Sequence, residues 1–230
     1  METFAPMEMF ADGDVLADAA ADALAQALEG EGPRSLVVTG GRSPGPVYER
    51  LSYRDLGWGE VMVTLSDERW VDPGAPESNA RLVYDRLLTG RAAAARFIPL
   101  KGAGATPEAD ASAVEPTLRR LLPWSAILLG MGEDGHVASL FPRDPDLAGR
   151  LDLAGERLCV GVATAGLPPF VPRLTLTVRA LLASRLVLLL ITGEAKQAII
   201  QRIRSDPAYA PPAAAILRQD RTPVRILWAP

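Results

Sequence analysis

The sequence contains one histidine, His136, which ends the glycine-rich segment GMGEDGH directly after the apolar run at 126–129. Imidazole titrates near neutral pH, so neutral His136 can accept a proton from water and act as a general base. The glycines permit a tight turn and a close approach of the backbone to a ligand. We therefore expect His136 to be catalytic rather than structural, with Asp134 as its partner and Gly132 in the substrate-binding loop.

The same loop also fits the GxGxxG spacing of a dinucleotide-binding turn, through Gly130, Gly132 and Gly135. That fingerprint requires a helix of several turns immediately afterwards. Here Pro142 and Pro145 interrupt the residues that follow, so the match is interpreted as coincidental. One histidine and one distant cysteine, Cys159, cannot assemble a standard zinc site, and we expect Cys159 to be a buried thiol.

Three further segments offer groups that can bind an anion. The turn TGGRSP joins a predicted strand to a predicted helix, where backbone N–H groups favour a phosphate. Lys196 falls in the first turn of another predicted helix, where a bound anion would offset its unfavourable interaction with the helix dipole. Arg173 begins the alternating run RLTLT and can fork onto a phosphate. The predicted phosphate-binding residues are Gly40, Gly41, Arg42, Ser43, Arg173 and Lys196. Taken singly, these segments fit equally well a plain turn, a surface lysine and a sheet-edge arginine.

The polar segment SDERW follows another predicted strand. Asp67 and Arg69 have the charge and reach to contact polar groups of a substrate, and we expect both to belong to the catalytic set with His136 and Asp134. Asn79 can contact the ligand or fix this loop. Taken alone, the segment is as consistent with a solvated ion pair of little energetic value.

Length and charge restrict the class of protein. A chain of 230 residues suits one α/β domain spanning residues 1–230, and its net charge of −4 disfavours nucleic acid or an anionic membrane as partner. The N-terminal stretch lacks a basic region typical of a secretory signal, and no apolar run is long enough to span a bilayer. We expect a cytoplasmic protein that is a monomer or a weak homo-oligomer.

Short apolar runs alternate with helical patterns, which predicts a Rossmann-like, mainly parallel sheet with helices on both faces. Strands are expected at 35–39, 61–65, 97–100, 126–129, 158–163, 174–178, 186–192 and 224–228. Helices are expected at 15–28, from the TGGRSP turn to 51, and at 78–88, 106–122 and 193–204. The stretch 141–152, rich in Pro, Asp and Arg, is expected to be a surface loop.

Together these segments resemble the 6-phosphogluconolactonase family. The matching stretches are VVTGGRSPGPVYERL, TLSDERWVDPGAPESNARLVYDRLL, ILLGMGEDGHVASLFP, PPFVPRLTLTVRALLASRLVLLLITGEAK and RILWA, which together cover nearly the whole chain. The resemblance implies a sugar-isomerase/CoA-transferase-like fold with a small additional lobe, and no metal or organic cofactor. It also implies hydrolysis of a phosphosugar lactone, 6-phospho-D-glucono-1,5-lactone, to 6-phospho-D-gluconate in the oxidative pentose phosphate pathway. The family often has GGST where this chain has GGRS, which leaves the role of Arg42 open.

Two other functions remain open at this point. Glucosamine-6-phosphate deaminase shares the fold and a GxDGH loop, but DER at 67–69 and ASLFP at 138–142 favour the lactonase. A non-catalytic module that only binds sugar phosphates would need no base, and the His136–Asp134 pair argues against it.

Overall fold

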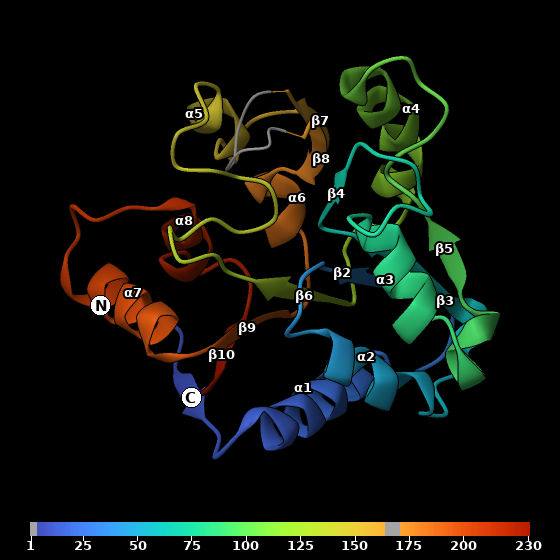
Figure 1. The fold of residues 1–230 in the computed structure, drawn as a ribbon, viewed down its shortest axis with the longest axis horizontal. Coiled ribbons are helices and arrows are strands. Elements are labelled where there is room, and N and C mark those ends of the chain that lie inside the picture. Colours follow the sequence, from blue (N-terminus) through green and yellow to red (C-terminus); the bar gives the residue numbers. More distant parts are fainter. Residues whose placement is uncertain (1–3, 164–170) are drawn as a thin grey trace.

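The computed structural model describes residues 4–163 and 171–230, and its largest element is a seven-stranded parallel sheet. The strands follow the spatial order β1-β10-β9-β6-β2-β3-β5, and every neighbouring pair is parallel. They are β1 (Met7–Met9), β2 (Arg34–Val38), β3 (Val61–Leu65), β5 (Arg96–Ile98), β6 (Ala126–Gly130), β9 (Val187–Thr192) and β10 (Val224–Ala229). This sheet confirms the predicted α/β class (Figure 1).

The central strands β2, β3, β6 and β9 are almost entirely buried, as expected for parallel strands covered on both faces. The six apolar runs that form strands of this sheet lie within two residues of their expected ends. The pattern does not predict β1, because an edge strand of three residues is too short to show a period.

The expected helices are also present. The helices are α1 (Gly13–Ala27), α2 (Gly45–Ser52), α3 (Asn79–Arg86), α4 (Pro107–Arg120), α5 (Leu147–Arg150), α6 (Val178–Leu182), α7 (Glu194–Ser205) and α8 (Pro212–Leu217). Side-chain oxygens of Asp12, Ser78 and Thr106 accept backbone N–H groups at the starts of α1, α3 and α4. Figure 1 shows α1 and α2 side by side along one side of the main sheet.

A second, three-stranded antiparallel sheet forms the expected additional lobe. It consists of β4 (Asp67–Arg69), β8 (Arg173–Leu176) and β7 (Cys159–Val162), with β8 in the middle. The SDERW segment is thus partly a strand, which the sequence does not predict. Thr177 lies just beyond β8 and caps the start of α6. The strand expected at 174–178 therefore ends two residues earlier, at Leu176.

The expected surface loop at 141–152 is mostly exposed, as predicted, but it also contains a short helix and three buried side chains. The stretch contains α5, and the side chains of Phe141, Asp144 and Arg150 are buried in it. Arg150 Nε lies 3.1 Å from Asp144 Oδ2, so burial of the guanidinium is compensated by an ion pair. The charged and proline residues of this stretch predicted exposure to solvent. Asp144 and Arg150 are nevertheless buried, because their charges neutralise each other inside the lobe.

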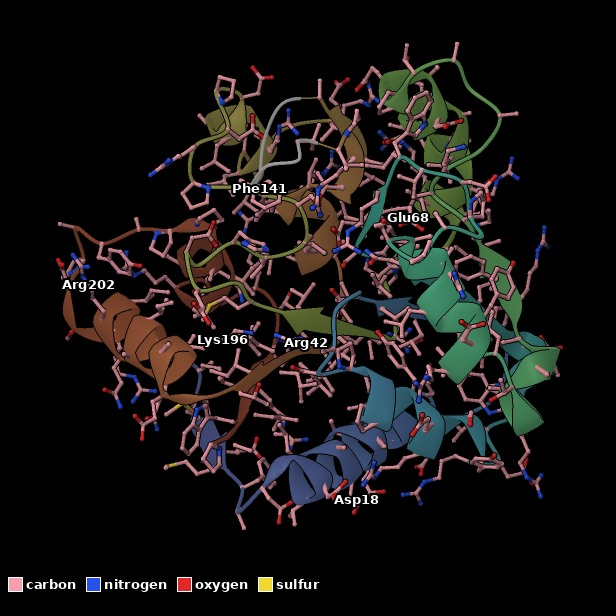
Figure 2. All side chains as sticks on the ribbon, in the orientation of Figure 1. Asp18, Arg42, Glu68, Phe141, Lys196 and Arg202 are labelled. Atoms are coloured by element: carbon pink, nitrogen blue, oxygen red, sulfur yellow. The ribbon has the colours of Figure 1, made fainter. Side chains whose placement is uncertain are left out.

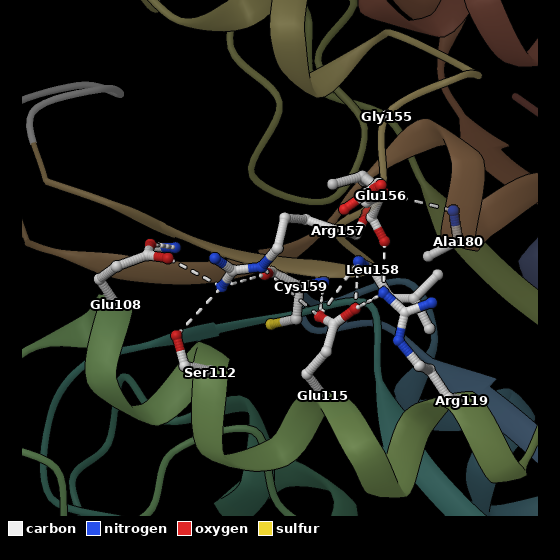
Figure 3. A network of polar contacts seen from close by, with 12 residues as sticks. Glu108, Ser112, Glu115, Arg119, Gly155, Glu156, Arg157, Leu158, Cys159 and Ala180 are labelled. Atoms are coloured by element: carbon white, nitrogen blue, oxygen red, sulfur yellow. Dashed lines mark hydrogen bonds and ion pairs between the residues drawn. The ribbon is translucent and has the colours of Figure 1, made fainter.

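A buried carboxylate ties α4 to the small sheet (Figure 3). Glu115 accepts the backbone N–H groups of Leu158 at 2.9 Å and Cys159 at 3.1 Å, and the guanidinium of Arg119 at 2.8 Å. Beside it, Arg157 pairs with Glu108 at 2.8 Å. Because these donors satisfy a carboxylate that is largely removed from water, the small sheet is fixed to α4 by charge as well as by packing.

The strand order creates a crevice between β2 and β6. β2 and β6 are neighbours in the sheet. After β2 the chain continues to β3, which lies on the far side of β2, and after β6 the next strand of this sheet is β9, which lies on the far side of β6. Loops at the carboxyl ends of β2 and β6 therefore diverge, and ligands bind at such switch points in open α/β sheets. The TGGRSP and GMGEDGH turns both emerge here.

Among the described residues, none of the helices combines the length and hydropathy needed to cross a bilayer. Cys159 is buried in β7, as expected, and burial raises the pKa of its thiol. Residues 1–3 of the N-terminal stretch, and the initial PPF of one family-like stretch, lie outside the described residues.

Tyr48 on α2 fixes the start of the TGGRSP turn. Its fully buried hydroxyl accepts the Thr39 N–H at 3.0 Å and donates to the Thr39 carbonyl. We expect Tyr48→Phe to lower the free energy of unfolding by about 1–3 kcal/mol, because it leaves these groups without a partner. Urea denaturation measures the change. Tyr53→Phe, on a side chain that is 71% exposed, is the matched control and should leave stability unchanged.

Candidate active site

A cavity opens at the switch point and draws its walls from both sheets. Every predicted site residue except Asp134 lines it. The lining comprises Thr39, Gly40, Gly41, Arg42, Ser43, Pro44, Asp67, Arg69, Asn79, Leu129, Gly130, Met131, Gly132, His136, Ala138, Arg173, Leu190 and Lys196. Segments far apart in the chain therefore meet around one polar space.

His136 is held by the carboxylate that precedes it. Asp134 Oδ1 lies 2.5 Å from His136 Nδ1 and also accepts the His136 backbone N–H at 3.1 Å. Burial would raise the pKa of Asp134, but these hydrogen bonds outweigh it and the pKa is lowered. With Nδ1 occupied, Nε2 is the ring nitrogen available to a substrate. A side chain at Gly132 would lie within 2.2 Å of the imidazole, which explains the glycine.

Phe141 packs against the side chains of both His136 and Arg173. Its ring centroid lies 4.7 Å from that of His136 and 5.3 Å from the guanidinium carbon of Arg173. Figure 2 shows Phe141 on the side of the small sheet, away from Arg42 and Lys196. The ring limits the movement of the imidazole and the guanidinium together. Its role was missed because the sequence indicated a surface loop.

Arg42 and Lys196 supply positive charge on the opposite side of the cavity (Figure 2). Within the two described ranges, neither forms an ion pair with a carboxylate. Burial lowers the pKa of the Lys196 ammonium, with nearby Glu133 opposing this and Arg42 adding to it. Two cations without carboxylate partners make this part of the cavity a favourable place for an anion.

Asp67 connects the small sheet to the catalytic loop. Its carboxylate accepts hydroxyl groups from Ser66 at 3.0 Å and Ser139 at 2.6 Å, and lies 3.8 Å from Arg173 Nη1. Burial lowers the pKa of Arg173, and the charge of Asp67 opposes that shift. These contacts fix the position of the Asp67 carboxylate at the cavity wall, and its expected catalytic role stays a prediction. Ser139 was missed, because nothing in its local sequence indicates a partner 72 residues away.

Glu68 fixes the other residues of this wall and was not singled out from sequence. Its buried carboxylate accepts backbone N–H groups of Arg69, Asn79 and Ala80 at 2.7–2.8 Å, and the Ser78 hydroxyl at 3.0 Å. Burial raises the pKa of Glu68, and these hydrogen bonds oppose the shift. The carboxylate thereby holds the start of α3 against β4.

Asn79 and Arg69 are in turn bonded to each other. Arg69 Nη1 donates to Asn79 Oδ1 at 2.8 Å and to the Glu77 carbonyl, and Asn79 Nδ2 donates to the Asp67 carbonyl at 2.8 Å. A side chain at Gly40 would overlap Asn79, so only glycine lets the TGGRSP turn pack here. Asn79 therefore links the TGGRSP turn to the small sheet.

Ala138 has an uncommon backbone conformation. Its φ of +50° is the only positive value at a non-glycine position in the described chain. A side chain in this left-handed region costs roughly 1–2 kcal/mol relative to the ordinary right-handed one. Neither composition nor periodicity signals such a conformation at an alanine.

The described residues contain no cluster of three or more His, Cys, Asp or Glu side chains that could hold a metal ion. The groups available in the cavity are an imidazole, guanidinium and ammonium cations, a carboxylate, an amide, hydroxyls and backbone N–H groups. The fold and cavity together define an α/β enzyme for a small anionic substrate.

Comparison with known proteins identifies the family. Residues 11–228 match the family model described as glucosamine-6-phosphate isomerases/6-phosphogluconolactonase. The 6-phosphogluconolactonase of Caulobacter vibrioides is 43% identical, with 97% of each chain covered, and that of Mesorhizobium japonicum is 41% identical, covering 94% of this chain and 90% of the relative. A crystal structure of a 6-phosphogluconolactonase from Shewanella baltica is similar with a TM-score of 0.93, 35% identity and 100% coverage of both chains.

The chain belongs to the 6-phosphogluconolactonase family and is a carboxylic ester hydrolase. This confirms the family indicated by the sequence motifs. A solved monomeric glucosamine-6-phosphate deaminase, 20% identical with a TM-score of 0.80, shows only that the fold is shared.

The Asp134–His136 contact has a measurable pH signature. The pKa of Asp134 is lower in the folded than in the unfolded state. The ionised Asp134 carboxylate therefore stabilises the fold at pH values above its unfolded pKa, and this stabilisation is lost as pH falls through its folded pKa. We expect Asp134→Asn to lower the melting temperature at pH 7, and the difference from the unmodified chain to shrink only as pH falls below about 4, the ordinary pKa of an aspartate, and through the lower folded pKa. Thermal unfolding across this pH range tests it, and a difference that persists unchanged at pH 3 would contradict it.

Proposed function

We propose that the protein hydrolyses 6-phospho-D-glucono-1,5-lactone to 6-phospho-D-gluconate, the lactone-opening step of the oxidative pentose phosphate pathway, with His136 as general base. The observation that carries the proposal is the cavity itself. It combines the only imidazole of the chain, oriented by Asp134, with two cations that have no carboxylate partner within residues 4–163 and 171–230. Relatives that cover almost the whole chain are named for this activity.

The reaction begins with water. Neutral His136 takes a proton through Nε2 as the water oxygen bonds to the lactone carbonyl carbon, C1. The resulting tetrahedral intermediate collapses, and the bond from C1 to the ring oxygen breaks. His136 returns its proton to that oxygen, which becomes a hydroxyl, and the new carboxylic acid ionises. No redox partner is required, and Asp134 stabilises the imidazolium that forms between the two steps.

The developing oxyanion needs a hydrogen-bond donor, and three N–H groups of the GMGEDGH turn already have partners within the turn. Gly132 N–H donates to the His136 carbonyl at 2.9 Å, Gly135 N–H to the Gly132 carbonyl at 3.0 Å, and His136 N–H to Asp134. These groups are therefore engaged. Arg173 lies against the same Phe141 ring as His136, and this supports a role near the carbonyl in addition to its expected phosphate contact.

Arg42, Lys196 and the TGGRSP backbone would hold the phosphate, which places the lactone carbonyl near His136. Arg69 and Asn79 would meet sugar hydroxyls. Because walls come from both sheets, we propose that residues 1–230 act as a single catalytic domain. One chain supplies all these groups, which is compatible with a monomer or a weak homo-oligomer.

His136→Asn should leave the fold intact and reduce turnover at least about a hundredfold, the usual scale for loss of a general base. Lactone generated enzymatically in the cuvette is followed against its spontaneous hydrolysis, with circular dichroism as the control for folding. A folded His136→Asn variant with near-normal turnover would remove the base assignment.

The same preparation distinguishes the competing functions. Incubation with glucosamine 6-phosphate should release no ammonia, and its release would favour the deaminase. Binding of the phosphosugar without acceleration of lactone loss would favour a non-catalytic module.

Lys196→Ala and Arg42→Ala should each raise KM about tenfold or more with a smaller change in kcat, because the phosphate contact persists from substrate to transition state. The chain offers a matched control in Lys101, its only other lysine, which lies outside the cavity beside Trp70. Lys101→Ala should leave KM unchanged. An unaltered KM in both cavity variants would place the phosphate elsewhere.

A further inference from the structure

Ala138 combines a cavity position with a backbone conformation that favours glycine. It lies two residues after His136, lines the cavity and is 8% exposed. Its φ of +50° falls where a Cβ is unfavourable. An outlier of this kind beside a base is a reason to look for a function of the side chain.

The loop contains glycine at other positions where geometry requires it. At Gly135 the φ is +78° and a Cβ would lie 2.6 Å from Pro211, while at Gly132 it would overlap the imidazole. At residue 138 the backbone would also suit glycine, yet a methyl group is present. The chain thus keeps a side chain with unfavourable backbone geometry at a position that lines the cavity.

The turn that carries this methyl group is fixed on both sides. Val137 and Leu140 form a β-bridge, and both are fully buried. Ser139 N–H donates to Thr175 Oγ1 at 3.1 Å, and the Ser139 hydroxyl donates to Asp67 at 2.6 Å. Ala138 thus lies between His136 and the buried Ser139. Because Ser139 is bonded to Thr175 and Asp67, the small sheet fixes the backbone position of Ala138.

We propose that the methyl group of Ala138 is a substrate-positioning contact, an apolar stop that sets how close the lactone ring lies to His136. The inference rests on the proposed lactone hydrolysis. With the phosphate held across the cavity, the substrate is fixed at one end, and a wall beside the base fixes the other. Removing the wall lets the ester carbon move away from the attacking water, which weakens catalysis without weakening phosphate binding.

Ala138→Gly tests this, because glycine suits the backbone and removes only the methyl group. We expect kcat/KM for the lactone to fall about tenfold. The inhibition constant of inorganic phosphate, a probe for the cationic end alone, should stay within about twofold. The melting temperature should change little, since relief of the φ strain opposes the loss of one buried methyl group.

Two further variants make the result decisive. Ala138→Asn retains a residue type that tolerates positive φ but fills the space, and it should abolish most turnover while the chain stays folded. Ala92→Gly, at a buried alanine in the 3₁₀ turn Gly90–Ala94 and outside the cavity, is the matched control for general loosening. It should lower stability and leave kcat/KM unchanged.

Turnover in Ala138→Gly within twofold of the unmodified chain would overturn the inference while leaving lactone hydrolysis intact. A fall in kcat/KM matched by Ala92→Gly, or a parallel loss of phosphate inhibition, would also overturn it, because either outcome indicates loosening of the whole site. Absence of lactone turnover in the unmodified chain would instead overturn the proposed function, and this inference with it.

Discussion

The site depends on the divergence of two neighbouring parallel strands, β2 and β6. Their carboxyl ends lie together, but the chain leaves them toward opposite sides of the sheet, so no crossover fills the space between. Backbone N–H groups at the start of a helix and a rigid base-bearing turn can both face that space. The groups from both turns therefore line one cavity.

Two adjacent carboxylates then hold the small sheet over the crevice. Asp67 and Glu68 point to opposite faces of β4, as successive strand residues do. Asp67 anchors the catalytic turn through Ser139, and Glu68 anchors the start of α3 through backbone N–H groups. Burying two charges side by side is expensive unless each is fully hydrogen-bonded. Their abundant donors make these contacts specific, and explain how a three-residue strand can position both walls of the cavity.

Features defined by neighbours in the sequence could be predicted from it, whereas features defined by contacts between distant segments could not. His136, Asp134, the TGGRSP turn and Lys196 were found because glycine spacing and charge placement are local signals. The buried central strands were found because parallel strands consist of continuous apolar runs. By contrast, β4 is short and polar and exists only by pairing with β8, about a hundred residues later. For the same reason, the sequence did not single out Ser139, Phe141 or Ala138. Ser139 and Phe141 are distinguished by their tertiary neighbours, and Ala138 by its backbone angle.

The charge distribution links this architecture to substrate choice. The chain carries a net charge of −4, and most of the arginines involved in ion pairs are on the surface. Arg42 and Lys196 differ in facing a cavity without a carboxylate partner among the described residues. A neutral lactone would leave that positive charge partly desolvated and uncompensated, whereas a phosphorylated one neutralises it. Under the proposed function, discrimination against unphosphorylated lactones would arise from the cost of leaving the two cations unneutralised as much as from their attraction to a bound phosphate.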